Sequence, residues 1–351
     1  MTATGQVLRV LALLLLVYAL PATVLSSSTT SALTPSLAAD PPDSSTFPST
    51  PGGLLPNPVP DPLPSPSPTS PPVSPFTGLP TDLDAPVLAV KIDNARSARP
   101  HSGLELADLV YVEPVEGGAS RLLAIYHSRL PAVVGPVRST RLTDLQLLAN
   151  FGRPALAFSG AAREIRALVA QAPVLDVSEL KRPGDYRRDR RKRMPHNLYG
   201  NADLLRAGGT PPKDIGFRFG ATPPGGHPVA GAEVNYRAAA IGVQWVPAEA
   251  RWVISMDGKP LTSASGPRPG AATVVLQRVP VHDTAIRDAS GAPSPFAATV
   301  GSGEVVVLRD GLAFQGSWSR PTPEAITTFT LPDGSPLPFA TGPVWVVLDP
   351  G

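Results

Sequence analysis

Acidic and basic side chains that could carry out chemistry are concentrated in two segments of the chain. The first runs from Lys91 to Asp144 and contains the motifs V-K-I-D-N, E-P-V-E-G-G-A-S-R and V-G-P-V-R-S-T-R. The second contains M-P-H-N-L-Y at residues 194–199. Arginines bind oxyanions through paired N–H groups, and a carboxyl group beside a histidine can move protons. We therefore expect a polar cleft that brings the two segments together.

The residues expected to bind a ligand there come from both segments and from the basic run just before the second. They are Lys91, Asp93, Asn94, Glu113, Glu116, Arg121, Arg138, Arg141, Arg188, Asp189, His196 and Asn197.

Several interpretations of this set stay open. The charges could form a buried or half-buried ion-pair lattice that holds loops together without any ligand. In that lattice Glu113 and Glu116 would pair with Arg121, and Asp93 with Arg138 or Arg141. They could instead bind an anionic or saccharide-containing ligand, because arginines and Asn/Asp pairs suit phosphate, carboxylate and sugar groups. A third possibility is a structural scaffold for other envelope proteins, in which the cleft has no ligand.

An enzyme is a further alternative, namely an envelope hydrolase or transferase. Glu116 or Glu113 would serve as carboxyl acid or base and His196 as proton carrier, while Arg138 and Arg141 would stabilise an oxyanion. The sequence contains no G-x-S-x-G elbow, no H-E-x-x-H and no phosphate-binding P-loop. Catalytic residues are therefore not assigned.

Neither a metal nor a cofactor is expected. The chain has no cysteine, which excludes disulfides, thiolate nucleophiles and Cys-ligated zinc. The spacing of His101, Glu105, His127 and His196 is not typical of a metal site.

The elements that must position the cleft residues belong to a predicted domain over residues 77–220. The apolar run 87–90 predicts a buried strand that delivers polar residues at its end. Runs at 109–112 and 121–127 flank a Gly-Gly turn and predict a hairpin. A helix is expected from about 161 to 170. Strands and helices alternate, so we expect an α/β (α+β) domain with an inserted antiparallel hairpin.

A second helix is expected to begin at Ser139-Thr140, where a hydroxyl would cap its first N–H groups. With Arg138 and Arg141 on either side, this helix start would form an oxyanion site.

Residues 221–351 predict a mostly β domain, a sandwich or a barrel. Short strand-like runs alternate with Asp-Gly turns at 257–258, 310–311 and 333–334. Three tryptophans lie inside strand patterns and are expected in the core, with a carbohydrate-stacking surface as the alternative. They are Trp252, Trp318 and Trp345. His282, Asp283 and Asp288 are expected to be polar loop groups rather than metal ligands.

The N-terminal part predicts export. Residues 1–32 hold a short apolar run between Arg9 and three serines, as in a signal peptide or signal anchor. Residues 33–76 are rich in Pro and Ser and predict a disordered linker.

The charge distribution favours a local anion site over nucleic acid as partner. The net charge is only +2, but residues 77–220 carry 21 Lys or Arg against 15 Asp or Glu. The run 187–193 contains six bases and one acid, and is expected to be either a solvated loop or an anion-contacting flap. The leader, the few aromatics and the modest total charge argue against nucleic-acid binding.

The ordered motifs resemble the YerB-like family, which is regarded as a family of envelope lipoproteins. The resemblance rests on V-K-I-D-N, A-D-L-V-Y-V-E-P-V-E-G-G-A-S-R, V-G-P-V-R-S-T-R and R-D…P-H-N-L-Y, followed by T-V-V-L-Q, V-G-S-G-E, D-G-L-A-F-Q-G-S-W-S-R and G-P-V-W-V-V-L. Together these motifs span roughly residues 76–350.

The resemblance implies a domain of unknown function followed by a separate C-terminal domain, and it implies no established reaction. Many members carry a lipoprotein signal that ends in Cys, and this chain has none. We therefore expect an extracytoplasmic protein that is secreted or held by an N-terminal segment, and not a Cys-anchored lipoprotein.

Overall fold

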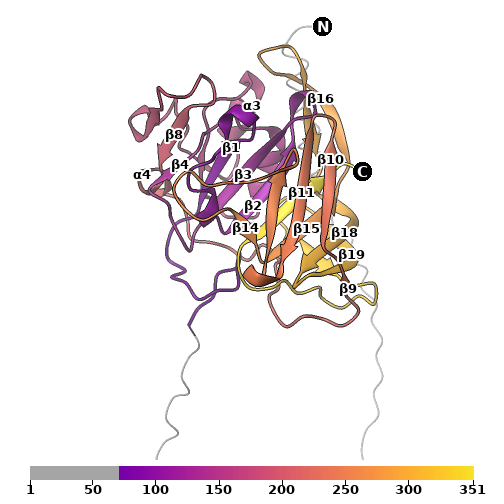
Figure 1. Ribbon diagram of the computed structural model, residues 1–351. Coiled ribbons are helices and arrows are strands. Elements are labelled where there is room, and N and C mark those ends of the chain that lie inside the picture. Colours follow the sequence, from indigo (N-terminus) through magenta and orange to yellow (C-terminus); the bar gives the residue numbers. More distant parts are fainter. Residues whose placement is uncertain (1–70) are drawn as a thin grey trace, which may run out of the picture. The chain divides into compact units, whose positions relative to one another are not determined.

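The computed structural model describes residues 71–351, which form one compact unit (Figure 1). The leader expected at 1–32 and most of the linker expected at 33–76 lie outside the described residues. Residues 71–76 already belong to the folded unit, because the Phe76 side chain is fully buried and packs against Phe151 and His127. None of the helices in residues 71–351 has the length and apolar character needed to cross a membrane.

The largest sheet has eleven strands. Ten follow one path in the order β20 (Thr328–Thr330), β19 (Leu312–Arg320), β18 (Gly301–Arg309), β15 (Thr273–Arg278), β21 (Val344–Asp349), β2 (Leu109–Pro114), β3 (Ser120–Tyr126), β1 (Leu88–Asp93), β5 (Ala155–Ala157) and β6 (Leu175–Asp176). The eleventh strand, β9 (His227–Pro228), pairs with β19.

Smaller sheets and short helices surround this large sheet. The second sheet contains β10 (Gly231–Tyr236), β11 (Ala239–Val246), β12 (Arg251–Met256), β13 (Lys259–Pro260) and β14 (Gly270–Ala271). A third joins β4 (Val133–Val134), β8 (Leu198–Asn201) and β7 (Tyr186–Arg188), and a hairpin joins β16 (Val281–Arg287) and β17 (Pro293–Ala297). The α-helices are α2 (Leu142–Leu148), α3 (Arg163–Val169) and α4 (Ala202–Arg206).

Strand β21 joins the two halves of the chain. It runs parallel to β15 on one side and to β2 on the other, where Leu109 pairs with Val344 and Val112 with Val347. Its first five residues are all buried, as are all six of β2. Such continuous apolar runs are typical of strands covered on both faces. One sheet therefore extends through both the 77–220 and the 221–351 regions.

The second sheet covers part of this shared sheet. The hydroxyl of Tyr236 on β10 lies 2.7 Å from the carbonyl oxygen of Leu348 and 3.1 Å from that of Val112, so its single proton can be donated to either. The tryptophans expected in the core are there: Trp252, Trp318 and Trp345 are at most 1% exposed. This burial rules out a carbohydrate-stacking surface built on them.

The mostly β character of the molecule is confirmed, as is an arrangement of two domains, which share the large sheet and so form one compact unit. The expected hairpin is β2–β3, and β1, β5 and β6 are mutually parallel. The three α-helices within residues 71–351 are only five to seven residues long. The α/β label of the N-terminal half therefore stays a prediction.

The Tyr236 hydroxyl predicts a measurable link between the two sheets. Tyr236→Phe removes the one buried donor that both carbonyl oxygens share, so we expect the free energy of unfolding in urea to fall by about 1–2 kcal/mol. Tyr126→Phe is the matched control, because its hydroxyl is buried without a hydrogen-bond partner among the described residues. Equal losses in the two variants would contradict the assignment.

Candidate functional site

A cavity of about 260 Å³ lies where three strand ends of the shared sheet meet loops from the C-terminal half. Its lining comes from the end of β1 and the segment that follows it, the β2–β3 turn, the segment before α2, the loop before β8, and three turns from beyond residue 230. The lining residues are Asp93, Asn94, Ala95, Arg96, Arg99, Val115, Glu116, Ala119, Ser120, Arg121, Arg138, His196, Ala238, Ala239, Asp257 and Asp288. Both halves of the chain therefore build it.

Half of the residues predicted from the sequence line this cavity. They are Asp93, Asn94, Glu116, Arg121, Arg138 and His196. Strand pairing brings three of the charged groups together, because Arg121 on β3 lies opposite both Asp93 on β1 and Glu113 on β2. Residues opposite one another across strands project to the same face of a sheet.

Asp93 is a hub at the end of β1. Its Oδ2 atom lies 2.6 Å from Nδ1 of His196 and 3.2 Å from Nε of Arg138, and its Oδ1 accepts the backbone N–H of Ala95 at 3.1 Å. The carboxylate thus has partners on both oxygens. It holds His196, a residue distant in sequence, against the strand end.

Glu116 is held by Arg141 in a two-pronged pair. Nε of Arg141 lies 2.6 Å from Oε1 and Nη2 lies 2.7 Å from Oε2. Burial alone would raise the pKa of Glu116, but the hydrogen bonds and charge of Arg141 lower it below its usual range. The carboxylate is therefore ionised and engaged at both oxygens, which makes it a poor proton donor.

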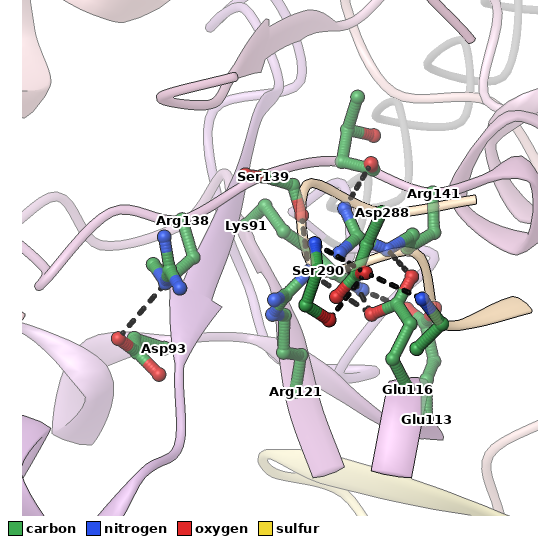
Figure 2. Close-up of polar contacts among 12 residues, drawn as sticks. Lys91, Asp93, Glu113, Glu116, Arg121, Arg138, Ser139, Arg141, Asp288 and Ser290 are labelled. Carbon is green, nitrogen blue, oxygen red and sulfur yellow. Dashed lines mark hydrogen bonds and ion pairs between the residues drawn. The ribbon is translucent and has the colours of Figure 1, made fainter. Parts of the chain in front are cut away.

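Arg121 is the least compensated charge of the cluster (Figure 2). Its side chain is 11% exposed, and Nη1 donates to the backbone oxygen of Ser139 at 3.2 Å. Its one ion pair within residues 71–351 is long, with Nη1 4.0 Å from Oε2 of Glu116. Burial, followed by the positive charge of Arg141, lowers the pKa of Arg121 to about 10. The guanidinium faces the cavity with its charge largely unmatched.

Three other charged groups lie beneath the cavity and do not reach it. Lys91, Glu113 and Asp144 are essentially unexposed. Nζ of Lys91 is 2.8 Å from Oε1 of Glu113 and 2.7 Å from Oδ1 of Asp144. Lys91 and Glu113 were expected to bind a ligand, but in the structure they are buried and form ion pairs beneath the arginines of the site.

The two carboxyl groups of this buried cluster differ in protonation. Oδ2 of Asp144 accepts hydrogen bonds from the Thr140 hydroxyl at 2.8 Å and the Arg141 N–H at 2.6 Å. Burial alone would raise the pKa of Asp144, but the charge of Lys91, the hydrogen bonds from Glu113 and Lys91, and the N–H of Arg141 lower it. For Glu113, burial first and then the Asp144 charge raise the pKa to about 8. At neutral pH one ammonium, one carboxylate and one neutral carboxyl group share the site, so it carries no net charge.

The expected capping of α2 is different in the structure. The helix begins at Leu142 rather than at Ser139-Thr140, and Asp144 takes up the N–H of Arg141. The seven-residue helix therefore uses its own carboxylate at its start. The backbone N–H of Arg141 is thus taken up by Asp144, and of the two arginines in that segment Arg138 lines the cavity while Arg141 does not.

The remaining predicted residues belong to the 186–197 loop. Nδ2 of Asn197 donates to the backbone oxygens of Asp189 and Lys192, both at 3.2 Å, and Oδ1 accepts from Nη1 of Arg188 at 3.1 Å. Arg188 also pairs with Glu179 at 2.7 Å. Asn197 is buried and fixes the loop, while Arg188 and Asp189 line a separate hollow.

Sequence reasoning missed several residues of the cavity wall. Nη1 of Arg99 bonds Oδ2 of Asp257 at 3.0 Å, and Asp257 comes from a turn predicted only as a hairpin signal. Asp288, expected to be a loop group, also lines the cavity. The backbone N–H of Ala238 donates to the carbonyl of Gly118 at 2.9 Å, which docks another turn beside the wall. In residues 71–351 no three His, Asp or Glu side chains are grouped to hold a metal ion.

The raised pKa of Glu113 predicts a pH-dependent stability. The folded protein keeps this proton up to about pH 8, whereas the unfolded chain loses it near its ordinary value of 4.5. The free energy of unfolding should therefore fall as pH rises from about 5 to about 8, by at most about 1.4 kcal/mol per pH unit. Urea unfolding of wild type and Glu113→Gln across this range tests it, because the neutral amide removes the dependence.

The difference between the two proteins isolates Glu113. Buried His101, whose pKa burial lowers to about 4, contributes a dependence of opposite sign that is present in both and cancels. Parallel stability curves for wild type and Glu113→Gln would contradict the assignment.

Two family models match the sequence of this chain. Residues 76–214 match the family model described as the N-terminal domain of a protein of unknown function, DUF3048, and residues 232–346 match the model of its C-terminal domain. A Bacillus subtilis protein named "Putative lipoprotein YerB" is 31% identical over 144 residues. That match covers 37% of this chain and 40% of the relative, so it spans less than half of either protein.

A solved structure shows the same fold. The crystal structure of YerB protein from Bacillus subtilis superposes with a TM-score of 0.68 at 22% identity, covering 80% of this chain and 97% of that one. With matches to its N-terminal and C-terminal domains, the chain belongs to the DUF3048 family.

Proposed function

We propose that the protein binds an anionic ligand of the cell envelope, bearing a carboxylate or phosphate, in the cavity beside Arg121. The observation that carries the proposal is the poor compensation of this guanidinium. Its nearest acid is 4.0 Å away and is already held by Arg141. A bound oxyanion would supply the missing counter-charge.

Arg138 is suited to assist Arg121. Both line the cavity, and Arg138 is 23% exposed while Nε is held by Asp93 at 3.2 Å. Two arginines fixed by the surrounding protein lose little freedom when an anion binds, and charge-assisted hydrogen bonds to a carboxylate or phosphate are strong. The buried cluster of Lys91, Glu113 and Asp144 is neutral, so the layer beneath does not cancel their charge.

We place this activity outside the cytoplasm. The leader-like residues 1–32 support that location, as does the word "lipoprotein" in the name of the Bacillus subtilis relative. The name describes that protein and carries no ligand with it.

Replacing Arg121 tests the proposal. Arg121→Met keeps the length of the side chain and removes the charge, so we expect binding of inorganic phosphate or succinate, measured by titration calorimetry, to weaken at least about 30-fold. The free energy of unfolding should stay equal or rise, because a poorly paired buried charge is replaced by an apolar side chain.

Arg163→Met on the exposed face of α3 is the matched control and should leave both measurements unchanged. Strong destabilisation by Arg121→Met would favour a purely structural ion-pair lattice. Unchanged anion binding in Arg121→Met, or none in wild type, would reject the proposal.

The pairing of His196 with Asp93 favours hydrolysis as a second candidate. A carboxylate 2.6 Å from Nδ1 orients an imidazole in the way that a general base requires, and His196 lines the cavity. Glu116 is less suited to this role than the sequence suggested, because Arg141 holds both of its oxygens.

Hydrolysis predicts release of product from wall glycopeptides or phosphate esters. His196→Ala should slow it by about 100-fold or more, whereas His227→Ala, at an exposed position on β9, should not. No turnover by wild type, or equal rates in both variants, would eliminate this candidate.

A further inference from the structure

We propose that the cavity is one end of a longer groove that binds a linear phosphodiester polymer of sugar or polyol units. This inference rests on the proposed anion site and names its ligand class. It makes the basic loop at residues 187–192 the other end of the same binding surface.

Three hollows follow one another along the surface. The first is the cavity of about 260 Å³, and the second, of about 250 Å³, shares Arg96, Arg99 and Asp257 with it. The third, of about 310 Å³, shares Pro100 with the second and is lined by every residue of the basic loop from 187 to 192. Shared lining residues make the three hollows neighbours.

The segment 96–102 forms the floor between two walls. On one side, Nζ of Lys192 in the basic loop donates to the backbone oxygens of Ala98 and Pro100, at 3.0 and 3.2 Å. On the other side, the backbone N–H of Ala264 donates to the oxygen of His101 at 2.8 Å. The N-terminal half therefore provides one wall and the C-terminal half the other, and both are tied to the floor.

The groove as a whole carries an excess of positive charge, which comes from the second and third hollows, because the first is lined by four Arg and four Asp or Glu. The three hollows are lined by ten Arg or Lys and five Asp or Glu. Most of these acids already have basic partners. Asp257 pairs with Arg99 at 3.0 Å, and Asp189 with Arg191 at 3.0 Å.

The cations left over are distributed from one end to the other. Arg121 lies in the cavity, Lys259 in the middle hollow, and Arg187 and Arg190 at the basic loop. Lys259, Arg187 and Arg190 are exposed and have no ion pair among residues 71–351. A single small anion would use one of these positions, whereas a chain with repeated phosphates can use all of them.

The lining favours a polymer without bases over a nucleic acid. Proteins that bind single strands stack bases on exposed aromatic rings. Two aromatic rings line these hollows. The imidazole of His196 is held by Asp93 at 2.6 Å. Tyr199 is 6% exposed and lies under the Lys192 ammonium, 5.7 Å from Nζ to the ring centroid. The groove can therefore neutralise phosphates but offers no surface for stacking.

Binding of a poly(glycerol phosphate) oligomer, of its monomer glycerol 3-phosphate, and of single-stranded DNA of equal charge tests the inference. Affinities are measured over a range of salt concentrations with three proteins: wild type, Arg187→Ala/Arg190→Ala, and Arg163→Ala/Arg166→Ala. The third changes the charge equally on exposed positions of α3 outside the groove.

We expect wild type to bind the oligomer more tightly than the monomer and than DNA. The loop variant should weaken oligomer binding about fivefold and reduce the salt slope by about 1.4, since each lost phosphate contact removes roughly 0.7. Its affinity for the monomer should be unchanged, and the α3 variant should behave as wild type.

Each contrary result has a distinct meaning. If the loop variant and the α3 variant bind the oligomer alike, the groove is wrong, while loss of monomer binding in Arg121→Met would still support the cavity. If DNA binds as tightly as the oligomer with the same dependence on Arg187 and Arg190, the assigned ligand class is wrong. If wild type binds neither monomer nor oligomer, the anion site fails and the groove fails with it.

Discussion

The parallel pairing of β2 with β21 is the constraint on which the rest of the molecule depends. It places a strand from the C-terminal end of the chain inside a sheet begun by the N-terminal half. Because β21 also pairs with β15, the turns of the C-terminal half are carried to the edge of the cavity. The site is consequently a property of the whole folded unit, and neither half contains it alone.

Charge in the site is arranged in layers that solve different problems. The lowest layer, around Lys91, is fully buried. The cost of burying its ammonium is offset by the carboxylate of Asp144 and the neutral carboxyl group of Glu113. The next layer pairs Arg141 with Glu116 almost completely. Only the layer that faces the cavity leaves Arg121 poorly matched. The charges are thus less completely paired the closer they lie to solvent. This gradient distinguishes the residues that support the site from those suited to bind a ligand more clearly than residue type does.

The sequence was a good guide where local chemistry decides and a poor one where distant segments meet. The hairpin β2–β3 followed from two apolar runs around Gly117-Gly118. The union of His196 with the end of β1 was also foreseen, because both motifs carry polar groups next to strands.

Other features depend on long-range contacts that leave no local pattern. Nothing near Asp257 or Asp288 announces that these turns close a cavity beside Asp93. The sequence also did not decide whether Lys91 and Glu113 bind a ligand or form a buried ion pair, because a charged residue inside an apolar strand pattern is compatible with both. The helix starts two to three residues later than expected, and there the Asp144 carboxylate accepts the Arg141 N–H and the Thr140 hydroxyl while its other oxygen contacts Lys91.

The enclosed position of β21 also bears on how the chain reaches its native state. Along the chain, its parallel neighbour β15 lies much closer to β21 than its other parallel neighbour, β2. Strand β2 therefore cannot complete its pairing until the C-terminal end of the chain is in place. Closing so long a loop costs entropy before any contact offsets it, and folds rich in such pairings are slow to form. Until β21 arrives, β2 and β15 present unpaired apolar edges of the kind that attract other chains.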